Sequence, residues 1–185
     1  MDTLLWIILG IIAVAAVAVI AMYNALIRLK VRVDEAWSDI DVQLKRRYDL
    51  IPNLVETVKG YAAHERETLD SVVQARSQAM QAGTAADKAK AENALSETLK
   101  SIFALAENYP NLKANENFLE LQRELSDTEN KIQAARRFYN GNVRDFNTKL
   151  QVFPTNMMAG LLGFTAREFF GIDNEAEREV VKVKF

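Results

Sequence analysis

Residues 3–27 carry no charge, and residues 4–22 form an almost unbroken apolar run, LLWIILGIIAVAAVAVIAM. As a helix, these roughly 19 residues span about 28 Å, which is close to the ~30 Å hydrocarbon core of a bilayer. The rest of the chain is charged and has a helical pattern. We therefore predict that residues 3–27 are a membrane-spanning helix in contact with the lipid bilayer.

The same run has an alternative interpretation as a cleaved signal peptide. Residues 13–15 and 16–18, both AVA, match the small-x-small pattern of cleavage sites. However, the segment before the run holds Asp2 and no Lys or Arg, whereas a secretory signal normally begins with positive charge. Trp6 and Tyr23 also stand near the two ends of the run, where aromatic residues mark membrane interfaces. These features favour a retained anchor.

Basic residues beside the run predict its orientation. Arg28, Lys30 and Arg32 follow it directly, and residues 45–47, KRR, come a little later. The positive-inside rule then places the C-terminal body in the cytoplasm. A large domain can override this rule, so the periplasmic side stays an alternative, and a chain without cysteine suits either compartment.

The composition of the chain points to long helices. It has 23 basic and 25 acidic residues, a near-neutral balance that argues against nucleic acid as a partner. Three prolines and seven glycines leave little room for turns. We predict an all-α fold in which an N-terminal transmembrane helix is followed by an antiparallel helical bundle.

Three stripes of mostly apolar residues have helical spacing. The first steps alternately by four and three residues, like a heptad seam, and consists of Val33, Trp37, Ile40, Leu44, Arg47, Ile51, Leu54, Val58 and Tyr61. The second consists of Leu95, Thr98 or Leu99, Ile102, Leu105 or Ala106, and Tyr109. The third consists of Phe118, Leu121, Leu125, Thr128, Ile132, Ala135, Tyr139, Asn142, Phe146, Leu150 and Phe153. A heptad seam is also a self-association surface, so we expect a homo-oligomer.

The breaks in the pattern give a helix map. We expect the first helix to run from the apolar segment to about residue 82, the second over about 85–108 and the third over about 115–152. Pro52 lies inside the first stripe and cannot donate to the Tyr48 carbonyl, so it should kink or interrupt that helix. Asn115 is placed to cap the third helix, and Pro154 to end it.

The C-terminal part of the chain has a different character. We divide the chain into an anchor (1–27), a bundle (28–153) and an apolar cap segment with a tail (154–185). Residues 153–164, FPTNMMAGLLGF, are apolar but too short to span a membrane, and Phe169 and Phe170 follow. We expect this segment to seal the bundle end or to pack into a neighbouring subunit. The alternative is an interfacial membrane contact or a partner dock, which the small number of basic residues disfavours.

The tail and the polar residues suggest no reaction. Residues 180–185, VVKVKF, alternate like a strand that could add to a partner's sheet edge, although a locally packed end is the commoner case. His64 is the one histidine and cysteine is absent, so ordinary zinc, iron–sulfur and di-iron sites are nearly excluded. A lone helical histidine beside Glu65 and Glu67 is most often a surface or packing residue. We predict no catalytic residue, no metal and no cofactor.

Two polar features in the stripes need an explanation. Arg47 occupies a buried-type position, and a desolvated guanidinium requires a carboxylate. Asp49 is too close in sequence to face it on a helix, so we expect a partner from another helix or subunit. If Pro52 breaks the helix, Arg47 can instead reach water. Residues 140–142, NGN, lower helicity and could let another helix approach or fix its register.

Residues 36–61 form a long motif, AWSDIDVQLKRRYDLIPNLVETVKGY, which is followed by His64 and Glu65. Further motifs are residues 136–140 (RRFYN) and 143–147 (VRDFN), the Phe153-Pro154 segment and the basic, aromatic-ended tail. In these motifs the chain resembles the bacterial LemA family over nearly its whole length. The resemblance implies a bacterial single-pass membrane protein with a helical-bundle body. It implies no catalytic activity and no active-site residues.

Two functional hypotheses remain. The first is a non-enzymatic scaffold at the bacterial inner membrane that self-associates and organises partners, other membrane proteins among them. The second is a membrane-attached ligand or stress sensor that uses the zones of Arg47, Asp49 and His64 and of Asn140 and Arg144 as a polar pocket. The structural or interaction candidates are Trp37, Arg47, Asp49, Pro52, Tyr61, His64, Tyr139, Asn140, Arg144, Phe153, Phe169 and Phe170.

Overall fold

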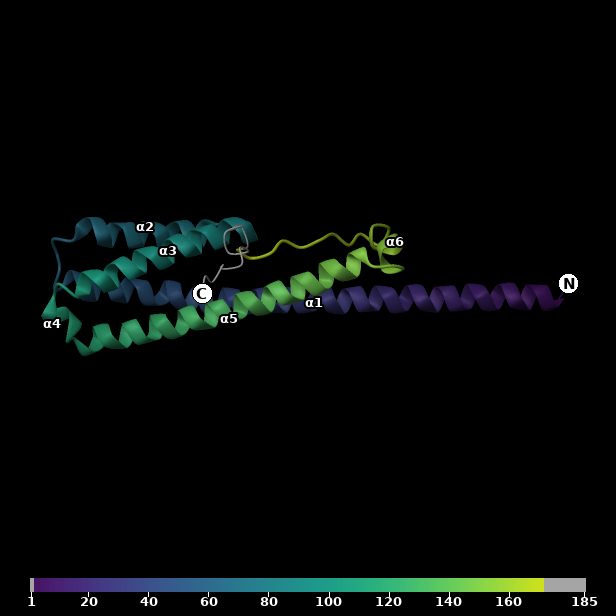
Figure 1. Cartoon of the computed structure of the whole chain (residues 1–185), viewed down its shortest axis with the longest axis horizontal. Coiled ribbons are helices and arrows are strands. Elements are labelled where there is room, and N and C mark those ends of the chain that lie inside the picture. Colours follow the sequence, from purple (N-terminus) through teal and green to yellow (C-terminus); the bar gives the residue numbers. More distant parts are fainter. Residues whose placement is uncertain (1, 172–185) are drawn as a thin grey trace, which may run out of the picture. The chain divides into compact units, whose positions relative to one another are not determined.

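The computed structural model describes residues 2–171, and within this range the chain is helical with no strand (Figure 1). The helices are α1 (Asp2–Lys59), α2 (Arg66–Gln81), α3 (Ala85–Ala106), α4 (Pro110–Lys113), α5 (Glu116–Gln151) and α6 (Thr155–Ala159). The all-α prediction is confirmed. The strand-like pattern expected at residues 180–185 lies outside the described residues.

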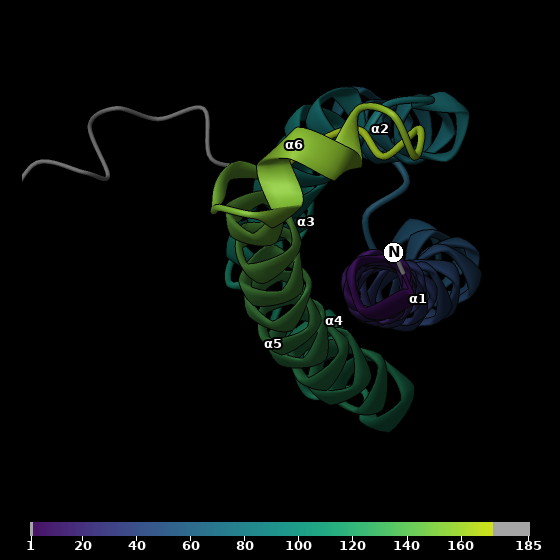
Figure 2. The ribbon, with the colours of Figure 1, turned by 90° about the vertical axis from the view of Figure 1, so that its right-hand side faces the viewer.

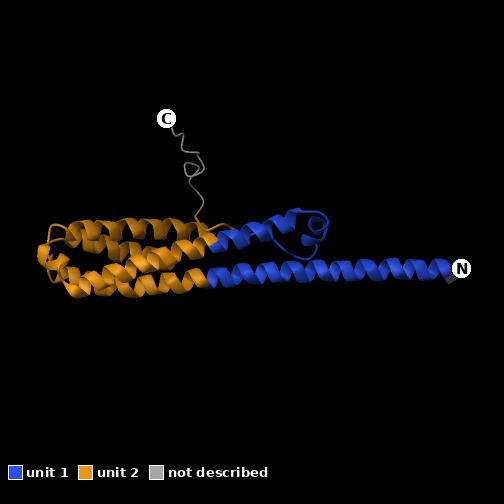
Figure 3. Cartoon of the chain, turned by 60° about the horizontal axis from the view of Figure 1, so that its bottom comes forward, with its two compact units in different colours: residues 1–38, 138–167 blue, residues 39–137, 168–185 orange. Residues whose placement is uncertain are grey.

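The chain divides into two compact units, coloured separately in Figure 3. Among the described residues, unit 1 contains 2–38 and 138–167, and unit 2 contains 39–137 and 168–171. Helices α1 and α5 each contribute residues to both units.

Helix α1 carries the apolar segment and continues far beyond it. Every side chain from residue 3 to residue 18 is exposed, and α1 is the one helix among the described residues that is long and apolar enough to cross a membrane. The helix then runs without interruption to Lys59, which confirms that the apolar segment and the first stripe share a helix. An exposed apolar surface of this length is typical of a segment that contacts a membrane or another protein.

The end of α1 corrects the predicted helix map. The expected helix to residue 82 is wrong, because α1 stops at Lys59 and α2 begins only at Arg66. The amides of Gly60 and Ala62 turn back to the carbonyls of Glu56 and Val58, at 3.3 and 2.8 Å, and close the helix. A basic last turn followed by glycine is an ordinary helix-stop signal.

Pro52, where the sequence favoured an interruption, lies inside α1 and does not end it. Proline has no N–H for the carbonyl of Tyr48, four residues earlier. That carbonyl instead accepts a hydrogen bond from Nε of Arg76 on α2, at 2.8 Å. A neighbouring helix thus replaces the bond that the proline removes.

Unit 2 is a four-helix arrangement. The part of α1 after residue 38, α2, α3 and the part of α5 up to residue 137 lie side by side and alternate in direction (orange in Figure 3). The side chain of Thr84 caps α3 by accepting from the Asp87 amide, and Asn115 caps α5 in the same way at Phe118. The larger buried residues of this unit include Ile40, Leu44, Ile51, Leu54, Val58, Leu69, Val72, Leu95, Leu99, Ile102, Leu112, Phe118, Leu125 and Ile132.

Unit 1 contains the first part of α1, the end of α5, and α6, which lies across the end of α5 in Figure 2. Aromatic rings join these pieces. Trp37 meets Tyr139 edge-on at 5.2 Å between ring centroids, and Phe164 meets both Phe146 and Tyr23, at 6.4 and 5.8 Å.

Most residues of the three stripes are buried, and the exceptions include Tyr61, Asn142 and Phe153. Tyr61 lies outside α1 and is exposed, and its hydroxyl accepts a hydrogen bond from the side-chain amide of Asn115 at 3.0 Å. In the third stripe Val143, not Asn142, is the fully buried residue. Phe153 is 78% exposed, so the expectation that this stripe reaches Phe153 is wrong.

Candidate functional site

The most unusual group in unit 2 is a charged side chain in the core. Arg47 lies three residues after Leu44 and four before Ile51, so the helical repeat turns it inward with these two apolar residues. Its side chain is only 3% exposed. A guanidinium in this position is stable only when its charge and N–H groups are paired.

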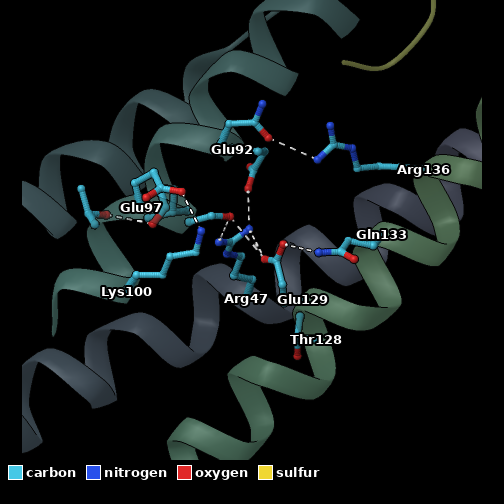
Figure 4. A network of polar contacts seen from close by, with 12 residues as sticks. Arg47, Glu92, Glu97, Lys100, Thr128, Glu129, Gln133 and Arg136 are labelled. Carbon is cyan, nitrogen blue, oxygen red and sulfur yellow. Dashed lines mark hydrogen bonds and ion pairs between the residues drawn. The ribbon is translucent and has the colours of Figure 1, made fainter. Parts of the chain in front are cut away.

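Two other helices supply the partners of Arg47 (Figure 4). Its Nη1 lies 3.1 Å from Oε2 of Glu129 on α5 and 3.4 Å from Oε2 of Glu92 on α3. Its Nη2 donates to Oγ of Ser96 on α3 at 2.6 Å. The guanidinium therefore joins α1, α3 and α5, and the alternative in which Arg47 reaches water is wrong.

Glu92 is the second buried member of this network. The hydroxyl of Tyr48 donates to its Oε1, while Arg47 faces its other oxygen. Burial raises the pKa of Glu92 above the ordinary 4.5, and the Tyr48 hydrogen bond and the charge of Arg47 oppose this rise only in part. Burial and the bond to Glu92 also raise the pKa of Tyr48, so its hydroxyl stays protonated and acts as the donor.

The network opens on one side into a groove between α3 and α5. The groove has a volume of about 700 Å³, and Arg47 and Ser96 contribute to its wall. Glu129 is 32% exposed, and its Oε1 accepts a hydrogen bond from the Gln133 amide at 3.3 Å. The other residues that line the groove are Leu99, Lys100, Phe103, Leu119, Gln122, Arg123, Leu125, Ser126, Asp127, Asn130 and Gln133.

The charged and hydrogen-bonding groups of this site pair with one another and form a polar layer in the core. Each of the groups Arg47, Tyr48, Glu92 and Ser96 contacts another member of the network. Among residues 2–171, no group of three or more His, Asp or Glu side chains is arranged to hold a metal ion. What the layer does is to hold three helices in one alignment, because a shift of one turn would separate the charges.

The structure separates several residues that the sensor hypothesis placed together. Asp49 lies on the exposed side of α1. His64 lies in the loop after α1, whose last residue, Lys59, is about 18 Å along the helix from Arg47 by the helical rise. Neither lines the groove. Asn140 and Arg144 belong to unit 1, where the exposed Arg144 lies 3.5 Å from Asp145.

The aromatic candidates have different surroundings. Trp37 and Tyr139 pack together, as described above. In unit 2, Phe170 is fully buried, with the Arg136 guanidinium 4.9 Å above its ring, while Phe169 is partly exposed. Gly171 follows with a φ of +70°, and a side chain at this position would collide with Arg136.

Residues 140–142 do not interrupt α5, which passes through them. Nothing in the described structure lies within 4 Å of a Cβ added at Gly141, so no helix of the described residues approaches closely there.

The sequence reasoning missed Tyr48, Arg76, Glu92, Ser96 and Glu129. Glu92 had a visible signal. It lies three residues before Leu95, and the second stripe continued backwards by its own spacing reaches it. Ser96 and Glu129 are polar residues beside a stripe, and only the packing of the helices brings them to Arg47. Packing likewise brings Arg76 to the Tyr48 carbonyl.

Comparison with known proteins identifies the relatives of this chain. The LemA family model matches residues 36–185, which include the whole polar network. The chain belongs to the LemA family. Protein LemA of Metamycoplasma hominis is 32% identical over 139 residues, which cover 74% of this chain and 63% of that protein. The chain thus spans less than two thirds of the length of this LemA relative.

More distant relatives carry a different name. Magnetosome protein MamQ 2 of Paramagnetospirillum magneticum is 22% identical over 85% of this chain and 68% of its own length. Magnetosome protein MamQ of Magnetospirillum gryphiswaldense is 23% identical over 80% of this chain and 64% of its own length. Neither LemA nor MamQ is the name of an enzyme.

Proposed function

We propose that this LemA-family protein is a non-enzymatic scaffold, anchored in the bacterial inner membrane by α1, that self-associates and organises partner proteins. Its bundle lies on the cytoplasmic side. The observation that carries the proposal is the continuity of α1. One uninterrupted helix holds both the exposed apolar segment and the buried residues Leu44, Ile51 and Leu54.

The continuity of α1 supports a scaffold over a tethered soluble domain. A tether joins its domain through a flexible linker, whereas here the helix that enters the membrane also supplies one of the bundle's core surfaces. The basic residues Arg28, Lys30 and Arg32 follow the apolar segment and support the cytoplasmic orientation.

The surface of unit 2 offers positions at which self-association can be tested. Val42 is 62% exposed, and Val73 and Met80 are also exposed on α2. Single exposed apolar side chains are ordinary on a protein surface, so these residues are probe positions and not themselves evidence of an interface.

Cysteine crosslinking tests self-association directly, because the chain has no cysteine of its own. We expect Val42→Cys to form a covalent dimer upon oxidation in native membranes, and Glu56→Cys, at an exposed charged position of α1, to form far less. Native mass measurement of the detergent-extracted protein should show more than one copy. Monomers alone, with no partner recovered by crosslinking, would contradict the scaffold function.

The orientation has its own test with the same Glu56→Cys variant. A maleimide that cannot cross membranes should label it only after the inner membrane is permeabilised. Labelling in intact spheroplasts would place the bundle in the periplasm and overturn the orientation.

The groove beside Arg47 favours a second candidate function, a ligand sensor. Its volume of about 700 Å³ is within the range of small-molecule sites, and Arg47 and Ser96 give it a polar wall. A thermal-shift screen of small anions and polar metabolites should then find a ligand whose effect disappears in Ser126→Trp, which fills the groove. Absence of any such ligand, with signalling unaffected by Ser126→Trp, would eliminate this function.

A further inference from the structure

Unit 1 contains a loop with an unusual surface. Residues 152–166, here called the apolar loop, include α6 and contain no charged residue. Several of its large side chains point away from the protein. Phe153 is 78% exposed, Met157 66% and Leu161 81%. These values are similar to those in the exposed apolar segment of α1, where Trp6 and Val14 are 72% and 71% exposed.

Polar contacts hold the base of the apolar loop to α5 and α1. The Asn147 side chain donates to the Arg167 carbonyl and accepts from the Arg167 amide, both at 2.9 Å. Nη2 of Arg167 lies 2.9 Å from Oδ1 of Asp34 on α1. The loop therefore returns to α1 at the level of Asp34.

An aromatic contact holds another part of the loop further along α1. Phe164 packs edge-on against Tyr23, at 5.8 Å between ring centroids. Tyr23 lies about 16 Å from Asp34 along the helix, by its rise per residue, in the direction of the apolar segment. Tyr23 is also the first residue after the run that ends at Met22. The loop thus extends along α1 to the boundary of the predicted span.

The burial of α1 agrees with this placement. Side chains from residue 3 to residue 18 are all exposed, whereas Val19 and Met22 are half-buried and Leu26 is fully buried. Protein therefore begins to cover α1 where the apolar run is ending.

We propose that the apolar loop is a second membrane contact, in which Phe153, Met157 and Leu161 enter the interfacial layer of the bilayer that α1 spans. This inference rests on the proposed membrane anchor. Lipid is the occupant because the loop belongs to the same unit as the exposed apolar segment of α1 and contacts α1 at Tyr23, directly after that segment ends. A loop without charge also has no desolvation cost of ionised groups at this depth.

The surroundings of the loop have the composition of a membrane interface. Tyr23 is an aromatic residue at the interface position, and Arg28, Lys30 and Arg32 follow within about 14 Å of helix. These cations lie at the level expected for lipid phosphates once the apolar run fills the hydrocarbon core. They supply the positive charge that the loop itself lacks.

Spin labels on single cysteines test this inference in the full-length protein. The protein is reconstituted into vesicles of phosphatidylcholine and phosphatidylglycerol, and a nitroxide is attached at Phe153→Cys or Leu161→Cys. Val14→Cys marks the span, and Met80→Cys is a matched control at an exposed apolar residue of unit 2. Collision rates with oxygen, which concentrates in lipid, and with a water-soluble nickel chelate are measured at each position.

We expect a high oxygen-to-nickel ratio at positions 153 and 161, close to that at 14 and well above that at 80. High nickel accessibility at 153 and 161, with position 14 in lipid, would overturn the loop contact and leave the anchor intact. High nickel accessibility at position 14 would overturn the anchor itself. Low accessibility to both reagents at 153 and 161, with spin–spin broadening, would show that a second copy covers the loop and would also overturn the proposal.

Discussion

At the residue scale, the central feature is the buried ionic layer around Arg47. One cation faces two carboxylates, of which Glu92 is buried with it and Glu129 is partly solvated. The sequence could predict that Arg47 needs a carboxylate from another helix, because desolvating a lone guanidinium is unfavourable. It could not predict which of the 25 acidic residues would serve, because that choice depends on how three helices align.

The first prediction concerns this ion pair. Arg47→Met leaves Glu92 buried without its cation and should lower the free energy of unfolding by about 3–5 kcal/mol. The neighbouring Arg46→Met breaks solvated pairs with Glu124 and Asp127 and should cost about 1 kcal/mol or less. Urea unfolding followed by circular dichroism measures both.

Restoring the balance of charge provides the control. The double variant Arg47→Met, Glu92→Leu should regain most of the lost stability, because no buried charge is left unpaired. Equal losses in the free energy of unfolding for Arg46→Met and Arg47→Met would show that the ionic layer around Arg47 is solvated.

The second prediction concerns pH. The pKa of Glu92 is raised above 4.5 in the folded protein. As the pH rises, the Glu92 carboxyl therefore loses its proton at a lower pH in the unfolded state than in the folded state. The free energy of unfolding should therefore fall as the pH rises from about 4.5 through the raised pKa. Glu92→Gln should lack this decrease, which parallel urea titrations at several pH values will measure.

Asp127 gives a control of opposite sign. A hydrogen bond from Lys131 lowers its pKa below 3.8, so the stability that it contributes is lost as the pH falls through that lowered value. Asp127→Asn should remove the decrease in the free energy of unfolding at acid pH and leave the decrease above pH 4.5 unchanged. If Glu92→Gln and the unmodified protein show parallel pH curves, Glu92 is not the titrating group.

At the element scale, α1 shows what local patterns predict and where they fail. The spacing of Ile40, Leu44, Ile51 and Leu54 correctly predicts a buried face, because helical geometry alone determines which residues share a side. The same pattern does not give the helix end. Pro52 is the stronger local signal for a break, but its effect is compensated by Arg76, a residue on another helix that local sequence does not place nearby.

The third prediction tests this compensation. Arg76→Met leaves the Tyr48 carbonyl without its donor and should lower the free energy of unfolding by about 1–3 kcal/mol. In a Pro52→Ala background the backbone amide at position 52 can donate to that carbonyl, so Arg76→Met should cost much less there. Urea unfolding of the four proteins gives the coupling energy. The same cost in both backgrounds would mean that Arg76 acts through packing alone.

At the scale of the whole molecule, the sequence predicted the fold class and the apolar segment but not the grouping of segments into units. Residues 138–167 and residues 1–38 are compact together although they lie far apart in the chain. Contacts such as Tyr23 with Phe164 create this grouping, and single aromatic residues have no pattern that identifies their partners.

The fourth prediction concerns the anchor. Lysines at Val14 and Val17 together should make insertion of the segment less favourable by about 5–7 kcal/mol. We expect the variant to move from the alkali-resistant membrane fraction to the soluble fraction. Lysines at Val31 and Val42, two exposed positions beyond the apolar run, add the same charge and should leave the protein in the membrane fraction. Release of both variants would contradict a span confined to the apolar run.

The ionic layer also has a consequence for synthesis. Glu92 follows Arg47 by 45 residues, which at typical translation rates of about 5–20 residues per second takes about 2–9 s to appear. During that interval the new α1 exposes an apolar stripe whose middle holds a hydrated cation. A hydrated cation there divides the stripe into two shorter apolar patches. We expect this division to lower the tendency of the nascent chain to associate wrongly before α3 and α5 have been made.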